Sequence, residues 1–452
     1  MRPVSSSVNR MAALSDSIGR AVTGSRALDV WAVVLPSLSF LQFQLGGQLI
    51  VSELLALGIL PWLLRSRERR LVPRWLIGLG GAWLAFQVVT DVFVHSAFAD
   101  WSRGWAAIAF TLIDLAVIII LLSTPQRARL FALGMAAGGL LGYVFAPSPY
   151  AATDPWKWAF AGPVAFILAA AVAGAAAARR PWLAVGAFVI FGVANSFFGF
   201  RSMSGVSLIA AAYLILSMLA IRRRESVLPS RRRVVAGLAY YGGTAIVIYV
   251  GLNVATEAGV FGQAAQTKFD AQAVVVATAS PGPAASPGPA ASAGAAANPL
   301  LVLAGGRSEI LASPRAILDS PILGHGSWAK DAKYVDLQRQ GLTDLGILGG
   351  NQPTDPNLIP AHSYLMQSWI WAGFAGGLFW LAVAVLALWL MGNLYAFRTN
   401  LAPLIAFSTT LLLWNIAFSP YGNTQRLLAT FGIGVCLLAL RKGRVPDQAA
   451  AS

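Results

Sequence analysis

The chain is poor in charge and in cysteine. Of its 452 residues, 11% are charged and 57% are hydrophobic, and the mean hydropathy is +0.66. Soluble domains are about one quarter charged, so this composition excludes a soluble globular protein. Cys436 is the single cysteine and lies inside the last apolar run. An intramolecular disulfide and a thiol metal site are therefore excluded, and the redox compartment stays open.

Motifs for metals and nucleotides are also missing. No cluster of His, Cys and carboxylates has zinc-ligand spacing, no G-x-x-x-x-G-K-[ST] motif is present, and the turn LGGQ from Leu45 has no acidic residue. Nucleotide-driven and metal-bound mechanisms are therefore disfavoured, and we expect neither a metal nor a cofactor. The net charge of +15 does not indicate nucleic acid, because the basic residues stand in short clusters between apolar runs.

Long apolar runs make up most of the chain. A helix of about 20 apolar residues crosses a hydrocarbon core of about 30 Å with every backbone polar group satisfied. The sequence predicts about twelve such spans. They fall near residues 28–45, 48–64, 75–95, 104–122, 129–146, 158–177, 182–199, 203–221, 234–254, 364–391, 401–418 and 425–440. The predicted fold class is an all-α polytopic membrane protein.

The basic residues predict the orientation, because cytoplasmic segments keep Lys and Arg. With the N-terminus inside, about 23 of the 33 basic residues fall on the cytoplasmic side. The polar tail 1–27 is followed by apolar runs without a cleavage site, so it is interpreted as part of an uncleaved signal anchor. We expect a bacterial inner (cytoplasmic) membrane protein with both termini cytoplasmic, a bundle over 28–254 of about nine helices, and three last helices in 362–452.

One large extracytoplasmic loop, 255–361, separates the two groups of helices. Its stretch 277–298 is rich in Pro, Gly and Ala and is expected to be disordered, because it cannot bury enough apolar surface to offset ordering. From Leu300 apolar residues return at helical spacing with charges between them. Short amphipathic helices over the bundle are predicted there.

Several ionisable residues fall on the predicted extracytoplasmic side. The three histidines are His95, His325 and His362. Arg201 interrupts the turn SFFGFRSMSG and Arg307 follows two glycines; ionisable groups at such depths are costly unless they bind or pair. Each also has a structural interpretation. Arg201 can snorkel to headgroups, Arg307 can form a solvated ion pair with Glu309, His362 can cap a helix, and His325 can mark a turn between glycines. Arg426, at the start of the last helix, fits an anchor or a ligand contact.

Three acidic residues, Glu53, Asp91 and Asp114, lie within or near apolar runs. They fit either a proton relay or buried pairing with groups at helix ends.

Three segments combine small residues with arginine or histidine. The first is FRSMSGVSLI, which contains Arg201. The second is GGRSEILASPRAILDSPILGHGSW, with Arg307, Pro321, Gly324 and Gly326. The third is HSYLMQSWIWAGFAGG, with His362, Leu365, Gly373 and Gly376. In this order, and with the helix number and loop position, they resemble the O-antigen ligase and O-antigen polymerase superfamily of bacterial membrane glycosyltransferases. The chain departs from the family at Ser363, where asparagine is usual, and at Trp371, where many members carry glutamate.

The resemblance implies a GT-C-like bundle and transfer of a glycan from undecaprenyl diphosphate to a sugar hydroxyl, on lipid A core or on another glycan. Two arginines can hold a diphosphate leaving group by bidentate hydrogen bonds without a metal, and a histidine of near-neutral pKa suits a general base. Arg201 and Arg307 are the expected clamp and His362 the expected base. Arg426, His325, Gly324 and Gly326 are expected in substrate binding, and membrane lipids are the surrounding partners.

Two other classes of function stay open. A transporter or flippase of lipid-linked sugars would use Glu53, Asp91 and Asp114, although inverted repeats and paired broken helices are not evident. A non-catalytic envelope assembly protein would leave the outward-facing His and Arg without a shared cavity. A groove shared by Arg201, Arg307 and His362 would favour the transferase.

Overall fold

The computed structural model describes residues 26–44, 48–174, 180–222, 231–263, 265–267, 306–345, 355–397 and 399–442. Within these ranges the chain is almost entirely helical, and the sheet found there is one two-stranded hairpin. The prediction of an all-α protein with membrane-spanning helices is confirmed to this extent. The stretch 277–298, most of the N-terminal tail and the end of the C-terminal tail lie outside the described residues.

Helices of two lengths account for the predicted spans. Among the described residues, seven are long and apolar enough to cross a membrane: Arg74–Phe93 (α3), Phe98–Leu121 (α4), Pro125–Phe145 (α5), Arg201–Arg222 (α10), Arg231–Glu257 (α11), Tyr364–Gly392 (α16) and Asn423–Lys442 (α18). Shorter helices cover the others: 26–37, Val51–Leu63 (α2), the π-turn Trp156–Phe160 (η2) running into Ala161–Val172 (α7), Pro181–Phe197 (α9) and Ala402–Phe418 (α17). The count of twelve spans stays a prediction.

The first predicted span, 28–45, is wrong in its second half. The helix ends at 37, and the chain continues into the strands Gln42–Gln44 (β1) and Gln48–Ile50 (β2), which pair antiparallel with Phe43 opposite Leu49. In β1 glutamine and phenylalanine alternate, which is the period of a strand, and this local pattern was hidden in the summed hydropathy of the run.

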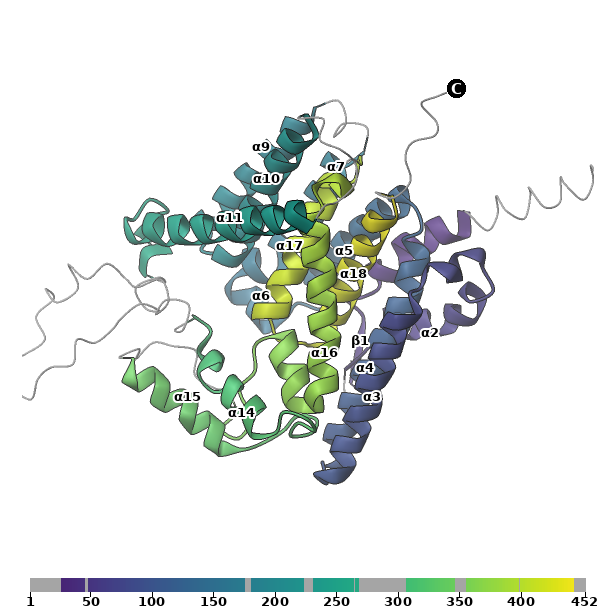
Figure 1. Cartoon of the computed structure of the whole chain (residues 1–452), viewed down its shortest axis with the longest axis vertical. Helices are drawn as coiled ribbons and strands as arrows, with labels where there is room; N and C mark the ends of the chain where they lie inside the picture. Colours follow the sequence, from purple (N-terminus) through teal and green to yellow (C-terminus); the bar gives the residue numbers. More distant parts are fainter. Residues whose placement is uncertain are drawn as a thin grey trace, which may run out of the picture.

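The helix α16 lies at the centre of the bundle (Figure 1). It packs against α3, α11 and α17, while α18 packs against α4 and α17. The ring centroids of Trp83 in α3 and Phe379 in α16 are 5.1 Å apart, and within α16 those of Tyr364 and Trp380 are 5.0 Å apart. The second contact packs the first turn of α16, which follows directly after His362, against its second half.

A kink interrupts α16 at Ala372 and Gly373. Gly373 has φ +58° and ψ −148°, and a Cβ there would lie 1.9 Å from the carbonyl oxygen of Ile322, so only glycine fits. The kink frees carbonyl groups, and segment 321–326 satisfies them. The amides of His325 and Gly326 donate to the carbonyls of Ile370 and Trp371 at 2.6 Å and 3.1 Å.

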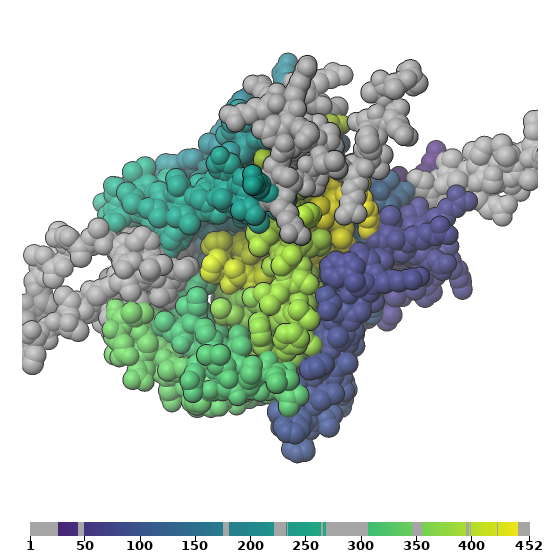
Figure 2. Space-filling view, in the orientation of Figure 1, coloured from purple at the N-terminus to yellow at the C-terminus, as the bar shows by residue number. Residues whose placement is uncertain are grey.

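The two ends of the bundle differ. Four short helices gather at one of them, here called the loop end: Pro149–Thr153 (α6), Ser308–Leu311 (η3), Ser313–Asp319 (α14) and Ala332–Asp344 (α15). The opposite end carries the 3₁₀ turns Arg67–Leu71 (η1) and Leu394–Phe397 (η4). Residues 306–345 form a lobe beside the first turns of α16 (Figures 1 and 2).

The short helices expected after Leu300 are present in this lobe. The helix α14 packs on α16, and α15 buries Tyr334, Val335, Gln338 and Leu342 along one face. This spacing is that of an amphipathic helix lying on a core.

Candidate active site

A pocket opens at the loop end between η3, α14 and the adjoining ends of α16 and α17. It is a small pocket that is partly open to its surroundings. Its lining combines three charged or titratable side chains with apolar ones and serines: Arg307, Glu309, Ile310, Ser313, His362, Ser363, Met366, Ala417 and Phe418. Arg307 and His362, which are 55 positions apart in the sequence, therefore share one cavity.

Two serines fix the walls of this pocket. The Ser313 hydroxyl lies 2.8 Å from the carbonyl oxygen of Glu309 and 2.6 Å from that of Pro360, which ties η3 and α14 to the segment that carries His362. Ser363 accepts a hydrogen bond from the Met366 amide at 3.1 Å, so it is the N-cap of α16. The Ser363 hydroxyl also donates to the carbonyl of Ile416 in α17 at 2.7 Å. Ser363 therefore anchors the segment that carries His362 to two helices.

The ionisable side chains of the pocket are partly buried, and burial shifts their pKa values. His362 and Glu309 are 30% and 16% exposed, and Nδ1 of His362 lies 3.4 Å from Oε1 of Glu309. Burial, followed by the charges of Arg307 and Lys157, lowers the pKa of His362 to about 4. Burial also lowers the pKa of Arg307 and raises the pKa of Glu309. The pKa of His362 is therefore lower than the near-neutral value expected from the sequence; near neutral pH the imidazole is uncharged, as a proton acceptor must be.

Arg201, the third expected catalytic residue, is not among the residues that line the pocket. It begins α10 at the loop end and interacts electrostatically with Tyr249 of α11. The turn before it packs against η2, since the ring centroids of Phe198 and Trp156 are 4.5 Å apart. Lys157, the next residue of η2, is one of the charges that act on His362. Arg201 therefore shares the loop end with the pocket but is not brought into it.

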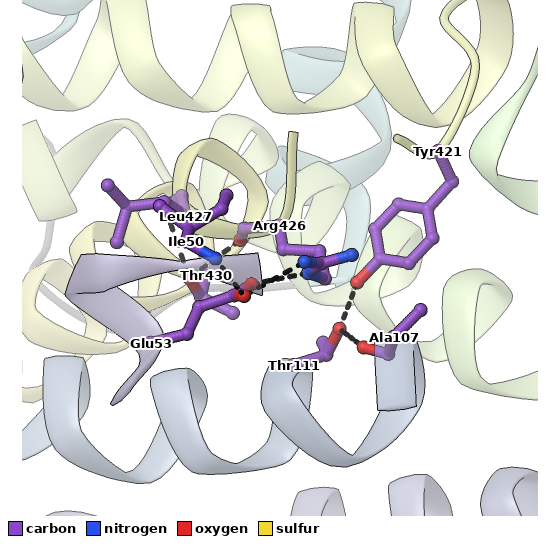
Figure 3. Close-up of polar contacts among 8 residues, drawn as sticks. All are labelled: Ile50, Glu53, Ala107, Thr111, Tyr421, Arg426, Leu427 and Thr430. Carbon is purple, nitrogen blue, oxygen red and sulfur yellow. Dashed lines mark hydrogen bonds and ion pairs between the residues drawn. The ribbon is translucent and has the colours of Figure 1, made fainter. Parts of the chain in front are cut away.

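Arg426 lies in the core rather than in the pocket (Figure 3). Its Nε and Nη2 atoms lie 2.5 Å and 2.9 Å from the two carboxylate oxygens of Glu53, and the two side chains are 4% and 1% exposed. The Tyr421 hydroxyl, hydrogen-bonded to Thr111 of α4, lies on the other side of the guanidinium (Figure 3). The bidentate pair joins α2 to α18. In the structure Arg426 forms an ion pair with Glu53. A contact between Arg426 and substrate stays a prediction.

The remaining predicted binding residues belong to the kink. Gly324 and Gly326 have φ of +82° and +89°, and a Cβ on Gly324 would lie 2.5 Å from the amide nitrogen of Gly373. Nε2 of His325 lies 2.7 Å from the carbonyl oxygen of Ala316 in α14. These residues support the pocket by shaping the lobe against α16, and none of them lines it.

The acidic residues in apolar runs are in different surroundings. Glu53 is ion-paired, as described above. Asp91 is the centre of a hydrogen-bond network that joins α3 and α4 to the lobe; its donors are the Ser96 hydroxyl, the Trp105 indole, the Gln87 amide, and the amide and hydroxyl of Ser327. Asp114 is fully buried, and neither carboxylate oxygen accepts a hydrogen bond from any described residue. The pairing interpretation is therefore confirmed for Glu53 and Asp91.

Glu309 is the pocket residue whose surroundings the sequence did not show. The motif GGRSEI placed it two positions from Arg307, which suggested a solvated ion pair. The η3 turn instead buries it against His362. Lys157 was missed, because it stands between two tryptophans at the edge of a predicted span and belongs to no motif.

The described ranges contain no group of three or more His, Cys, Asp or Glu side chains that could hold a metal ion. In comparisons with protein-family models, curated proteins and solved structures, nothing matches this chain.

Proposed function

We propose that the chain is a metal-independent membrane glycosyltransferase of the O-antigen ligase or polymerase type. It transfers a glycan from undecaprenyl diphosphate to a sugar hydroxyl at the loop end of the bundle. The observation that carries the proposal is the shared pocket of Arg307 and His362, an arginine and a neutral histidine from distant parts of the chain. Transfer with a diphosphate leaving group needs a cation and a base within reach of one another.

The proposed roles follow from the chemistry of each group. Arg307 binds the diphosphate, whose charge grows as the bond to the anomeric carbon breaks. Arg201 is the second arginine, reaching the donor from the adjoining end of α10. His362 accepts the proton of the acceptor hydroxyl; such a base contributes about 10²- to 10⁴-fold to the rate.

The proposed placement in the cell follows from the basic residues. The distribution of Arg and Lys along the sequence favours an extracytoplasmic loop end and cytoplasmic termini in the bacterial inner membrane. There the donor is a lipid-linked glycan, and the acceptor is either lipid A core or a growing glycan.

The experiment is transfer in vitro from a purified lipid-linked donor, with donor binding measured separately. His362→Ala is expected to abolish transfer and to keep donor binding, because the base acts in the transition state. Arg307→Lys and Arg201→Lys are expected to fail nearly as badly as the alanine variants, because lysine lacks the planar fork. His95→Ala, an exposed histidine outside the pocket, is the matched control.

Other outcomes distinguish the competing functions. Full transfer by His362→Ala removes the catalytic assignment. Movement of the donor across vesicles without transfer indicates a flippase, and neither activity indicates an assembly protein. In a deletion strain, single repeat units on lipid A core indicate a lost polymerase, and polymer accumulating on the carrier lipid indicates a lost ligase.

A further inference from the structure

The carboxylate of Glu309 stands beside the imidazole of His362. Oε1 of Glu309 lies 3.4 Å from Nδ1 of His362, so the carboxylate faces one edge of the ring. Nε2 lies on the opposite edge, and no described residue hydrogen-bonds to it. Among the described residues this edge has no partner, and it is the edge that the inference below assigns to a substrate hydroxyl.

The backbone around Glu309 holds it in this position. Its carbonyl oxygen accepts from the Ser313 hydroxyl at 2.8 Å and from the Ala312 amide at 3.1 Å. The same Ser313 hydroxyl lies 2.6 Å from the carbonyl oxygen of Pro360, two residues before His362. Glu309 and His362 are thus held to each other through one serine as well as through their own contact.

We infer that Glu309 is a positioning residue for His362, accepting the Nδ1 proton so that Nε2 is presented as the base. This inference rests on the proposed function for its catalytic meaning, although the pairing itself is a property of the chain alone. A carboxylate on Nδ1–H selects the tautomer with a free Nε2 and stabilises the imidazolium that forms.

The transfer step forms one bond, breaks one bond and moves one proton. The acceptor oxygen forms a bond to the anomeric carbon while the bond from that carbon to the diphosphate oxygen breaks, and the electron pair leaves with the diphosphate. The hydroxyl proton moves to Nε2 of His362, and the Glu309 carboxylate beside Nδ1 stabilises the resulting imidazolium. The ring then releases the proton to water.

Three ionisable side chains lie around the His362 imidazole or act on it electrostatically. Glu309 and Arg307 come from the lobe, and Lys157 comes from η2. The two cations disfavour a charged ring before reaction, and the pKa of His362 lies at about 4. Glu309 is the acidic side chain that lines the pocket among the described residues, and burial raises its pKa.

The first test does not depend on activity. The chain has three histidines, so histidine labelled with ¹⁵N gives a simple spectrum, in which His362→Gln identifies the ring of interest. At neutral pH we expect the proton of His362 on Nδ1. His325, whose Nε2 lies 2.7 Å from the Ala316 carbonyl, is an internal reference with the proton on Nε2. In Glu309→Leu the proton of His362 is expected to move to Nε2, while His325 stays unchanged.

The second test uses transfer. Glu309→Gln keeps the shape and an acceptor oxygen but removes the charge, so kcat is expected to fall by about 10- to 100-fold, a part of the whole contribution of a general base. KM for donor and acceptor is expected to stay within about twofold of wild type, since Glu309 is inferred to act through His362. Asp336→Asn, at an ion pair with Arg339 on the exposed face of α15, is the matched control.

The two tests separate two failures. A wild-type chain that transfers no glycan but has the Nδ1 tautomer refutes the proposed function and keeps the pairing. An Nε2 proton on His362 in the wild-type chain, or a tautomer that Glu309→Leu leaves unchanged, overturns the inference about Glu309. Monodispersity and the unfolding temperature of each variant show whether it is folded.

Discussion

Removing Arg426 is expected to destabilise the protein more than any other change to the buried polar core. The guanidinium makes two contacts with Glu53, at 2.5 Å and 2.9 Å, and the side chains are 4% and 1% exposed, so water cannot replace the lost partner. Asp114 adds a second carboxyl group that interacts electrostatically with both. Arg426→Met leaves the buried Glu53 carboxylate without a cation and is expected to cost about 3–5 kcal/mol of unfolding free energy.

Variants of Glu53 and Asp114 serve as controls for Arg426→Met. Glu53→Gln leaves Arg426 with Asp114 as a remaining acid nearby, so its cost is expected to be smaller, about 1–3 kcal/mol. The double variant Glu53→Gln/Arg426→Met removes both charges and is expected to lie within about 1 kcal/mol of wild type. Asp114→Asn is expected to be tolerated, because no described residue donates a hydrogen bond to this carboxyl group.

The assay is equilibrium unfolding of the purified chain in mixed micelles with increasing SDS, followed by tryptophan fluorescence. The hypothesis is that the charges of Arg426 and Glu53 neutralise each other in the core. It is refuted if the double variant is as unstable as Arg426→Met, or if Arg426→Met loses less than about 1 kcal/mol. The double variant also tests the predicted substrate contact: full transfer by this folded protein assigns Arg426 to stability, and lost transfer with wild-type stability assigns it to the substrate.

Three further predictions concern other parts of the chain. Shortening 277–298 is expected to leave transfer nearly unchanged, since loop closure depends weakly on length; lost activity at normal expression contradicts the tether interpretation. Transfer is expected to survive EDTA; a loss that magnesium or manganese restores indicates a metal-dependent enzyme. Because the folded-state pKa of His362 is about 4, below its unfolded value of about 6.5, its contribution to stability is present above pH 6.5 and declines as the pH falls toward 4. Stability measured between pH 7 and 4 should decline less in His362→Gln, and an equal decline contradicts the lowered pKa.

The helices were the predictable part of the fold. Ten of the predicted spans after the first two, such as 364–391 for Tyr364–Gly392, coincide closely with helices, because a long apolar run has one stable form in a membrane. The hairpin after residue 37 was not predicted, because a short alternation inside an apolar run carries little weight in a long window.

Some features of the candidate site were predictable from the sequence and others were not. His362 and Arg307 were expected together, and both line the pocket. Arg201 does not line it, and Arg426 pairs with Glu53, because the partner of a charge depends on helix packing that no local pattern encodes. The glycines of segments 321–326 and 372–377 were seen as separate motifs, and they are two sides of one contact at the kink.

By itself the sequence determined the membrane class, the positions of most helices and which ionisable residues stand near helix ends, because hydropathy and side-chain chemistry are local properties. Tertiary structure alone decided which of these residues meet. It buried Glu309 against His362, enclosed Arg426 with Glu53, and directed Asp91 to the lobe, since burial and pairing depend on helices that are distant in sequence and adjacent in space.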